Sequence, residues 1–255
     1  MIKFLALLII ISIACNNPQV TGVTSPPLQT PKATGDSIAL QLARDVILAC
    51  GGLEEWNAIH YLSFNFFDSR LWYWDKWSNR YRVESLRRSY RIAGTLDGKE
   101  TYLFANGKVE TNADSLSAYG KLAHNVWIND TYWLMMPFKL LDEGVQLSYK
   151  GVLPIDSTTS AKCIELTFDS VGVTPENKYL IYIDSTNHSI IHWSYFEQKN
   201  DTLPQLSNAW TDYKSYGNIK LSSGRGERSL KDIKIAENVP DHFFKDVSVP
   251  AKDLK

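Results

Sequence analysis

The sequence is poor in the residues that usually build catalytic and metal centres. It has three cysteines and five scattered histidines in 255 residues. Its formal net charge is −1, so it offers neither a broad basic field for nucleic acid nor an acidic tail. It also has no repeat of fixed period. These shortages argue against a nucleic-acid-binding protein, a clustered metal site and a solenoid.

Motifs for covalent catalysis and for phosphate binding are also missing. Residues 223–226, Ser-Gly-Arg-Gly, lack the strand–serine–helix context of a nucleophile elbow and the lysine of a phosphate-binding loop, and we expect a mobile loop there. His188 and His192 are spaced like a metal pair, but no cysteine or carboxylate completes the set. The sequence therefore predicts no catalytic residue, metal or cofactor, although dispersed residues could still assemble a hydrolase site.

The apolar run near the N-terminus is too short for a conventional transmembrane helix. Lys3 precedes uninterrupted apolar residues at 4–11, whereas a span needs about 20 residues. This arrangement is typical of an export signal, which we place at residues 1–14. Residues 15–35 are rich in Pro, Thr, Ser, Asn and Gln, and they predict a disordered tether.

The end of this signal resembles that of bacterial lipoproteins, in which a small residue precedes the cysteine that is lipidated. Ala14 and Cys15 match that pattern. The resemblance implies a lipid on Cys15 and a tethered protein of the bacterial cell envelope, at the outer membrane and facing the periplasm or the cell surface. The alternative is an ordinary cleaved signal in which Cys15 is incidental.

Two further cysteines, Cys50 and Cys163, lie in the predicted folded part. Export makes a disulfide chemically possible, but nothing in the sequence shows that the two residues meet. We favour two buried free thiols.

From residue 36 onward the sequence predicts one domain, 36–255, that is mainly antiparallel β with added helices. Asp36 or Ser37 caps a helix that Gly51 and Gly52 end. Roughly ten short strands follow, because apolar residues alternate at a period of two and turn dipeptides such as Asn106-Gly107 join them. The predicted strands are residues 60–68, 70–76, 80–86, 90–95, 102–104, 145–150, 163–168, 178–183, 190–196, 210–216, 219–221 and 228–236.

A helical insert at residues 114–142 separates the two groups of strands. Leu116, Tyr119 and Ala123 recur at helical spacing. Asn129 and Asp130 predict a break and a new N-cap for a short turn, which Pro137 ends.

Several strands carry apolar side chains on both faces, as at residues 71–74 and 179–183. A sheet with one wet face would not need them, so either both faces are covered or the inner face surrounds an apolar cavity. A packed aromatic core is the alternative for any single residue. The candidate ligand-binding side chains are Phe64, Phe66, Trp72, Trp74, Trp127, Trp133 and Met135.

The one local basic concentration comprises Arg80, Arg82, Arg87, Arg88 and Arg91. We favour a solvated strand face, with contact to anionic lipid headgroups as the alternative. Residues from 240 onward are expected to form a loosely attached tail in which Phe243 and Phe244 dock.

Two sequence segments carry a further resemblance: YWLMMPFKLL at residues 132–141, followed by predicted strands, and YLIYID at residues 179–184. With the signal, the N-terminal helix and the two meanders, they are similar to the Lol lipoprotein-carrier and receptor superfamily. The resemblance covers most of the folded region and implies a curved, unclosed β-barrel whose helices cover an apolar cavity. Cys15 matches the lipidated position of receptor-type members, and no other functional residue is carried over.

The leading hypothesis is a non-enzymatic envelope lipoprotein that is held at the membrane by its lipid and binds an apolar ligand such as an acyl chain. A structural or protein-binding envelope module with a dry core is the second hypothesis, and a hydrolase with a dispersed site is the third. An internal cavity large enough for an alkyl chain distinguishes the first from the second.

Overall fold

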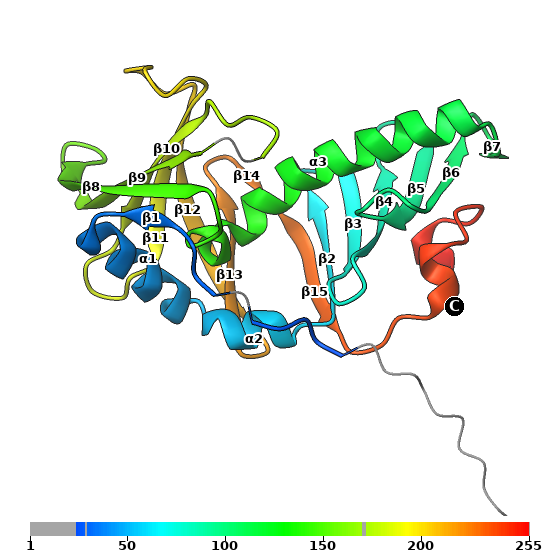
Figure 1. Cartoon of the computed structure of the whole chain (residues 1–255), viewed down its shortest axis with the longest axis horizontal. Helices are drawn as coiled ribbons and strands as arrows, with labels where there is room; N and C mark the ends of the chain where they lie inside the picture. The colour runs from blue at the N-terminus through cyan, green and yellow to red at the C-terminus, as the bar shows by residue number, and fades with distance from the viewer. Residues whose placement is uncertain (1–23, 29, 170–171, 255) are drawn as a thin grey trace, which may run out of the picture.

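Two mostly antiparallel sheets lie side by side, with three helices across one side of them (Figure 1). The computed structural model describes residues 24–28, 30–169 and 172–254. The seven-stranded sheet has the spatial order β15 (Lys231–Ala236), β2 (Tyr61–Phe66), β3 (Arg70–Asp75), β4 (Arg80–Ser85), β5 (Tyr90–Thr95), β6 (Thr101–Ala105) and β7 (Lys108–Glu110). The eight-stranded sheet has the order β1 (Thr34–Gly35), β8 (Val145–Pro154), β9 (Ser160–Phe168), β10 (Lys178–Ile183), β11 (Ile190–Phe196), β12 (Leu206–Tyr216), β13 (Ile219–Arg225) and β14 (Arg228–Ser229).

The predicted fold class, a curved and unclosed antiparallel β structure with an N-terminal helix and a central helical insert, is confirmed. The meander at residues 61–105 and the strands β10 and β11 form as the alternation predicts. One predicted strand, residues 228–236, is divided: β14 and β15 flank buried Leu230 and belong to different sheets. The chain therefore passes from the edge of one sheet to the edge of the other at this residue.

The inner face of the seven-stranded sheet is a continuous apolar row. In register across four strands, Phe64 pairs with Trp72, Trp72 with Val83, and Val83 with Ile92. All four side chains are almost fully buried, in one core that also includes residues of the other sheet and of the helices. Cross-strand aromatic and β-branched pairs of this kind stabilise a sheet, and here they form its helix-covered side.

Helix α1 (Ser37–Ala49) begins at Asp36, whose carboxylate accepts the backbone N–H of Ala39 at 2.9 Å, as the predicted cap requires. Helix α2 (Gly52–Ala58) follows after Gly51. Gly51 has φ +109°, and a Cβ there would lie 2.4 Å from the carbonyl oxygen of Asn218. This close approach places α1 and α2 against the eight-stranded sheet, where they contact β8 and β13.

Helix α3 (Ala113–Lys139) is a single 27-residue helix, so the predicted break at Asn129 and Asp130 is wrong. Asp130 does not cap a helix. Its buried carboxylate accepts Arg70 Nε at 2.6 Å, Arg70 Nη2 at 2.8 Å and Trp72 Nε1 at 2.7 Å, all from β3. Because these donors occupy the carboxylate, it does not compete for backbone N–H groups, and the helix continues.

Pro137 does not end α3 but lies within its last turn. A proline there has no N–H to give the carbonyl of the residue four positions earlier, Trp133. Arg225 supplies that bond, because its Nη2 donates to the Trp133 carbonyl. The predicted mobile loop at residues 223–226 is therefore also wrong: Ser223 to Arg225 end β13, and Arg225 is buried.

The C-terminal segment, residues 240–254, is not loosely attached. It contains two 3-10 turns, η1 (Asp241–Phe244) and η2 (Ala251–Asp253), and it covers the face of the seven-stranded sheet opposite α3 (Figure 1). Arg82 is fully buried there, and it donates to the carbonyls of Phe243 at 3.0 Å, Asp246 at 2.6 Å and Val249.

Arg91 adds bonds to the carbonyls of Val247 and Ser248, at 2.7 and 2.8 Å. Arg80 pairs with Asp241. The basic concentration is thus mainly a clamp for the C-terminal segment rather than a solvated face, although Arg87 and Arg88 are exposed.

The last residues of the predicted tether are paired rather than disordered. Thr34 and Gly35 form a short parallel bridge with β8, and the N–H groups of Lys32 and Ala33 reach the carbonyl of Leu141 at 2.9 and 3.2 Å. Cys15 and the predicted signal lie outside the described residues. Among the described helices, none combines the length and the hydropathy needed to cross a bilayer.

Candidate functional site

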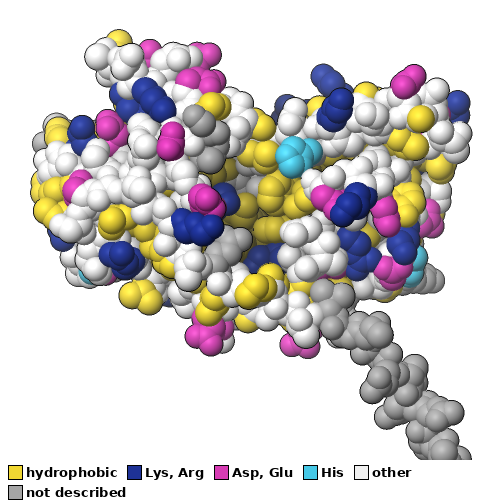
Figure 2. Space-filling model, viewed as in Figure 1, with side chains coloured by type: hydrophobic (Ala, Val, Ile, Leu, Met, Phe, Trp, Pro, Cys, Tyr) yellow, Lys and Arg dark blue, Asp and Glu magenta, His cyan; other side chains and the backbone are white. Residues whose placement is uncertain are grey.

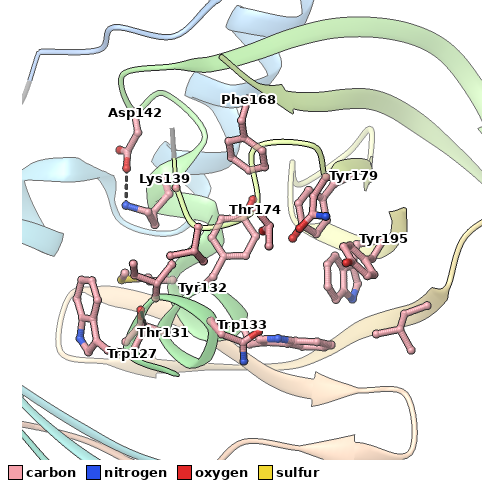
Figure 3. A pocket seen from close by; sticks show the side chains of 18 of the residues that line it. Trp127, Thr131, Tyr132, Trp133, Lys139, Asp142, Phe168, Thr174, Tyr179 and Tyr195 are labelled. Carbon is pink, nitrogen blue, oxygen red and sulfur yellow. Dashed lines mark hydrogen bonds and ion pairs between the residues drawn. The ribbon is translucent and has the colours of Figure 1, made fainter. Parts of the chain in front are cut away.

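The strongest candidate site is a cavity of about 480 Å³ between the C-terminal half of α3 and the inner face of the eight-stranded sheet. We call it the aromatic cavity, because Tyr, Trp and Phe side chains from both elements converge on it (Figure 3). Its volume is within the range of about 300–1,000 Å³ that is usual for small-molecule sites. Its main aromatic and apolar lining residues are Trp127, Tyr132, Trp133, Met135, Phe168, Tyr179, Trp193, Tyr195 and Leu206.

Ring contacts hold the walls of this cavity together. Tyr179 stacks on Trp193 with centroids 5.4 Å apart, and Trp193 meets Trp133 edge to face at 4.7 Å. Tyr179 also contacts Tyr132 and Tyr195, both near 5.5 Å. Because aromatic pairs in such geometries add stability beyond their buried area, this lining is ordered before any ligand enters.

Three buried polar atoms in this lining lack a partner: the Tyr132 hydroxyl, Trp127 Nε1 and Trp193 Nε1 make no hydrogen bond to any described residue. Burial raises the pKa of the Tyr132 hydroxyl well above its ordinary value, so the group stays neutral. The cavity wall therefore carries no charge at these positions but keeps unused donors.

A second cavity of about 610 Å³, which we call the lysine cavity, lies between α2, β3, α3 and residues 26–28 and 30–32. The two cavities share lining residues on and after α3, including Trp127, Met135 and Lys139. A hollow with hydrophobic side chains at its floor is visible between the two halves of the molecule (Figure 2). The lysine cavity is the more polar of the two, because Lys76, Asn57 and Asn79 line it together with Trp56 and Trp74.

Lys76 is buried and has no carboxylate partner among the residues that the structure describes. Its side chain is 7% exposed, its Nζ lies 3.7 Å from the centroid of the Trp56 ring, and it donates to the Trp56 carbonyl. Burial lowers the pKa of Lys76 to about 7. An amine held in this way is charged or neutral according to what occupies the cavity beside it.

Two ion pairs include charged residues of the wall that the cavities share. Lys139 pairs with Asp142, as the dashed line in Figure 3 shows. Lys32 pairs with Glu143 at 2.7 Å. Both join residues at the end of α3, and the second ties the N-terminal segment to that end.

The structure brings together four of the seven side chains that the sequence offers as ligand contacts. Trp127, Trp133 and Met135 line the aromatic cavity, and Trp74 lines the lysine cavity with Trp127 and Met135.

The other three predicted contacts, Phe64, Phe66 and Trp72, are buried in the core and line neither cavity. Sequence reasoning missed Lys76, which it placed as the last residue of the predicted strand 70–76 without a role in a site. It also missed Tyr179, whose signal was its place in a strand that is apolar on both faces.

The one histidine–serine contact in the described residues is on the sheet, away from both cavities. His192 Nε2 lies 2.8 Å from Ser207 Oγ, and Ser207 lies 2.9 Å from Ser194. Neither His192 nor Ser207 lines the aromatic cavity or the lysine cavity. Within the described ranges, no group of three or more His, Cys, Asp or Glu side chains could hold a metal ion.

Cys50 and Cys163 are free and buried, as the sequence favours. Burial raises the pKa of each thiol to about 12, which makes both groups unreactive at neutral pH.

No protein-family model matches the chain, and no curated protein matches it. The solved structures that are similar to it include three with low sequence identity. A DUF1329 family protein from Desulfovibrio piger has 8% identity and a TM-score of 0.43, over 81% of this chain and 97% of that one. A LolA superfamily protein from Nitrosomonas europaea has 10% identity and a TM-score of 0.34, over 73% and 87%.

The third is a domain from Vibrio parahaemolyticus described as an outer membrane lipoprotein-sorting protein, with 9% identity and a TM-score of 0.40, over 82% of this chain and 96% of that one. The unclosed antiparallel sheets and the helix across them, seen directly in this chain, form the architecture that the resemblance to the Lol superfamily implied.

Proposed function

We propose that this chain is a cell-envelope lipoprotein that binds the acyl chain of a lipid and catalyses no reaction. The single observation that carries the proposal is the aromatic cavity, whose walls are fixed by ring contacts and whose volume suits an alkyl chain. Lipidation of Cys15, a tether after it and a location at the outer membrane remain part of the proposal and rest on the sequence.

The free energy gained by burying methylene groups is large enough for an acyl chain of ordinary length to bind. Burying about twelve methylenes at roughly 0.8 kcal/mol each gives about 10 kcal/mol of favourable free energy. Association costs about 4–15 kcal/mol, so a net affinity in the micromolar range requires walls that are already ordered. The ring network provides this order, because Tyr179, Trp193 and Trp133 are held by one another before binding.

The test is uptake of a fluorescent fatty acid by purified protein stripped of bound lipid. We expect saturable binding at one site. Replacing Thr174, which lines the aromatic cavity, by Trp should fill the space and weaken binding at least tenfold. The matched control is Thr186→Trp, because Thr186 is exposed in the β10–β11 turn and lines neither cavity.

Stripped wild-type protein that takes up no fatty acid would overturn the proposal and favour the module with a dry core. A separate measurement tests the anchor: Cys15→Ser should move the protein from the membrane fraction to the soluble fraction without changing binding by the purified protein.

A further inference from the structure

The lysine cavity contains donors without acceptors. Lys76 Nζ can donate three hydrogen bonds and makes one, to the Trp56 carbonyl. Trp74 and Trp127 also line this cavity, and the Nε1 of each is buried with no hydrogen-bond partner among the described residues. Buried donors are nearly always paired in proteins, so a cavity with this excess suits a ligand that brings acceptors.

The charges around the cavity leave Lys76 unmatched. The other charged side chains in its lining are Lys32, Lys139, Asp142 and Glu143, and they form two ion pairs with one another. From α2, the lining side chains are Leu53, Trp56 and Asn57, which carry no charge. An anionic group beside Lys76 would therefore find one available cation in an apolar surrounding, where a charge-assisted hydrogen bond is strong.

We infer that the lysine cavity is the head-group site for the acyl ligand and selects a free carboxylate, with Lys76 as its partner. This inference rests on the proposed function, because the aromatic cavity, with which it shares Trp127 and Met135, would hold the alkyl chain. The ligand class is thus a free fatty acid rather than an ester-linked lipid. Trp74 and Trp56 form the apolar walls around the amine.

Protonation supports this assignment. Burial lowers the pKa of Lys76 to about 7 in the empty cavity, so part of the protein holds a neutral amine at pH 7. A bound carboxylate favours the charged form, and Lys76 then takes up a proton as the ligand binds. Carboxylate affinity should accordingly fall as the pH rises above 7, by up to tenfold per pH unit.

The experiment compares dodecanoic acid with its methyl ester, by isothermal titration calorimetry on lipid-stripped full-length protein. Wild-type protein should bind the acid at least tenfold more tightly than the ester at pH 7. Lys76→Met, which keeps an unbranched chain of similar length, should weaken acid binding by about ten- to a hundredfold and leave ester binding within threefold.

The matched control is Lys178→Met. Lys178 also donates to a backbone carbonyl, that of Asp201 at 2.7 Å, and lies over an aromatic ring, that of Phe196 at 4.4 Å, but it lines neither cavity. It should bind both ligands as the wild type does. The ester meets the same two ion pairs as the acid, so it controls for their charges across the pH series.

Equal binding of acid and ester by wild-type protein, with no loss of affinity for the acid between pH 7 and 9, would overturn the head-group assignment and leave the acyl-chain proposal standing. Binding of neither ligand would overturn both. Because the wild-type comparison and its pH series need no substitution, the result does not depend on whether Lys76→Met folds.

Discussion

Removing Arg225 should destabilise the protein, and one of the bonds lost, the one that its Nη2 donates to the carbonyl of Trp133, can be tested separately. Pro137 leaves that carbonyl without its helical donor. The sharpest perturbation is therefore a pair of substitutions, Arg225→Met and Pro137→Ala, made singly and together. Alanine restores the N–H that the helix lacks, so the second change should compensate for part of the first.

The magnitude follows from the contacts. Arg225 also donates to Ser222 Oγ at 2.8 Å and to the Gly224 carbonyl at 2.6 Å, and its guanidinium lies 3.2 Å from the centroid of the Trp210 ring. Burying the Arg225 cation opposes these favourable contacts, because removal from water destabilises its charge and lowers its pKa to about 9. We expect Arg225→Met to reduce the free energy of unfolding by about 2 kcal/mol, since typical single changes cost about 0.5–3 kcal/mol.

With Pro137→Ala in place, the loss should shrink by about 1–2 kcal/mol, because the Trp133 carbonyl is no longer left without a donor. Urea unfolding of the wild type, the two single variants and the double variant gives this coupling energy. In this double-mutant cycle, the effect of the proline on the unfolded chain cancels. Arg228→Met, an exposed neighbour on β14, is the control and should change stability little. Additive losses, within about 0.5 kcal/mol, would refute the reasoning.

Three further predictions concern other buried charges. Asp130→Ala should cost about 3–5 kcal/mol in urea unfolding because it leaves Arg70 unpaired; a loss below 1 kcal/mol would contradict this. Arg82→Met should speed amide hydrogen exchange at residues 240–254 much more than in β2 and β3. Unchanged exchange at residues 240–254 would show that the clamp is not needed. Because burial lowers the pKa of Lys76 to about 7, the unfolded state binds more protons than the folded state above pH 7. The free energy of unfolding should therefore rise between pH 7 and about 9.5. A rise of equal size in Lys76→Met would show that other groups cause it.

Much of the fold could be predicted because its signals are local. Alternation at a period of two and turn dipeptides such as Asn106-Gly107 define consecutive hairpins without reference to distant residues. The errors came where a distant partner changed a local preference. Asp130 would cap a helix if Arg70 did not hold it, and residues 223–225 would form a loop if the Trp133 carbonyl did not need a donor.

The candidate site could be predicted only in its chemical character. A ring that faces a packed core and a ring that faces a cavity have the same position in the alternation, so Trp72 and Trp74 could not be told apart. Lys76 could not be found at all, because a lysine at the end of a predicted strand gives no sign of burial. Only the packing of Trp56 and Trp74 around it shows its environment.

The hydrogen bonds of Asp130 and of the Trp133 carbonyl also help to determine how the two cavities are placed. Asp130 is bonded to the seven-stranded sheet and the Trp133 carbonyl to the eight-stranded sheet, three residues apart. One turn of an α-helix takes 3.6 residues, so a single turn connects both sheets. Hydrogen bonds are directional, so these bonds add to the constraint that close packing already places on the position of the helix along the sheets. Because Trp127 lies one turn before Asp130 and Met135 just after Trp133, these two residues, which line both cavities, are held at this connection.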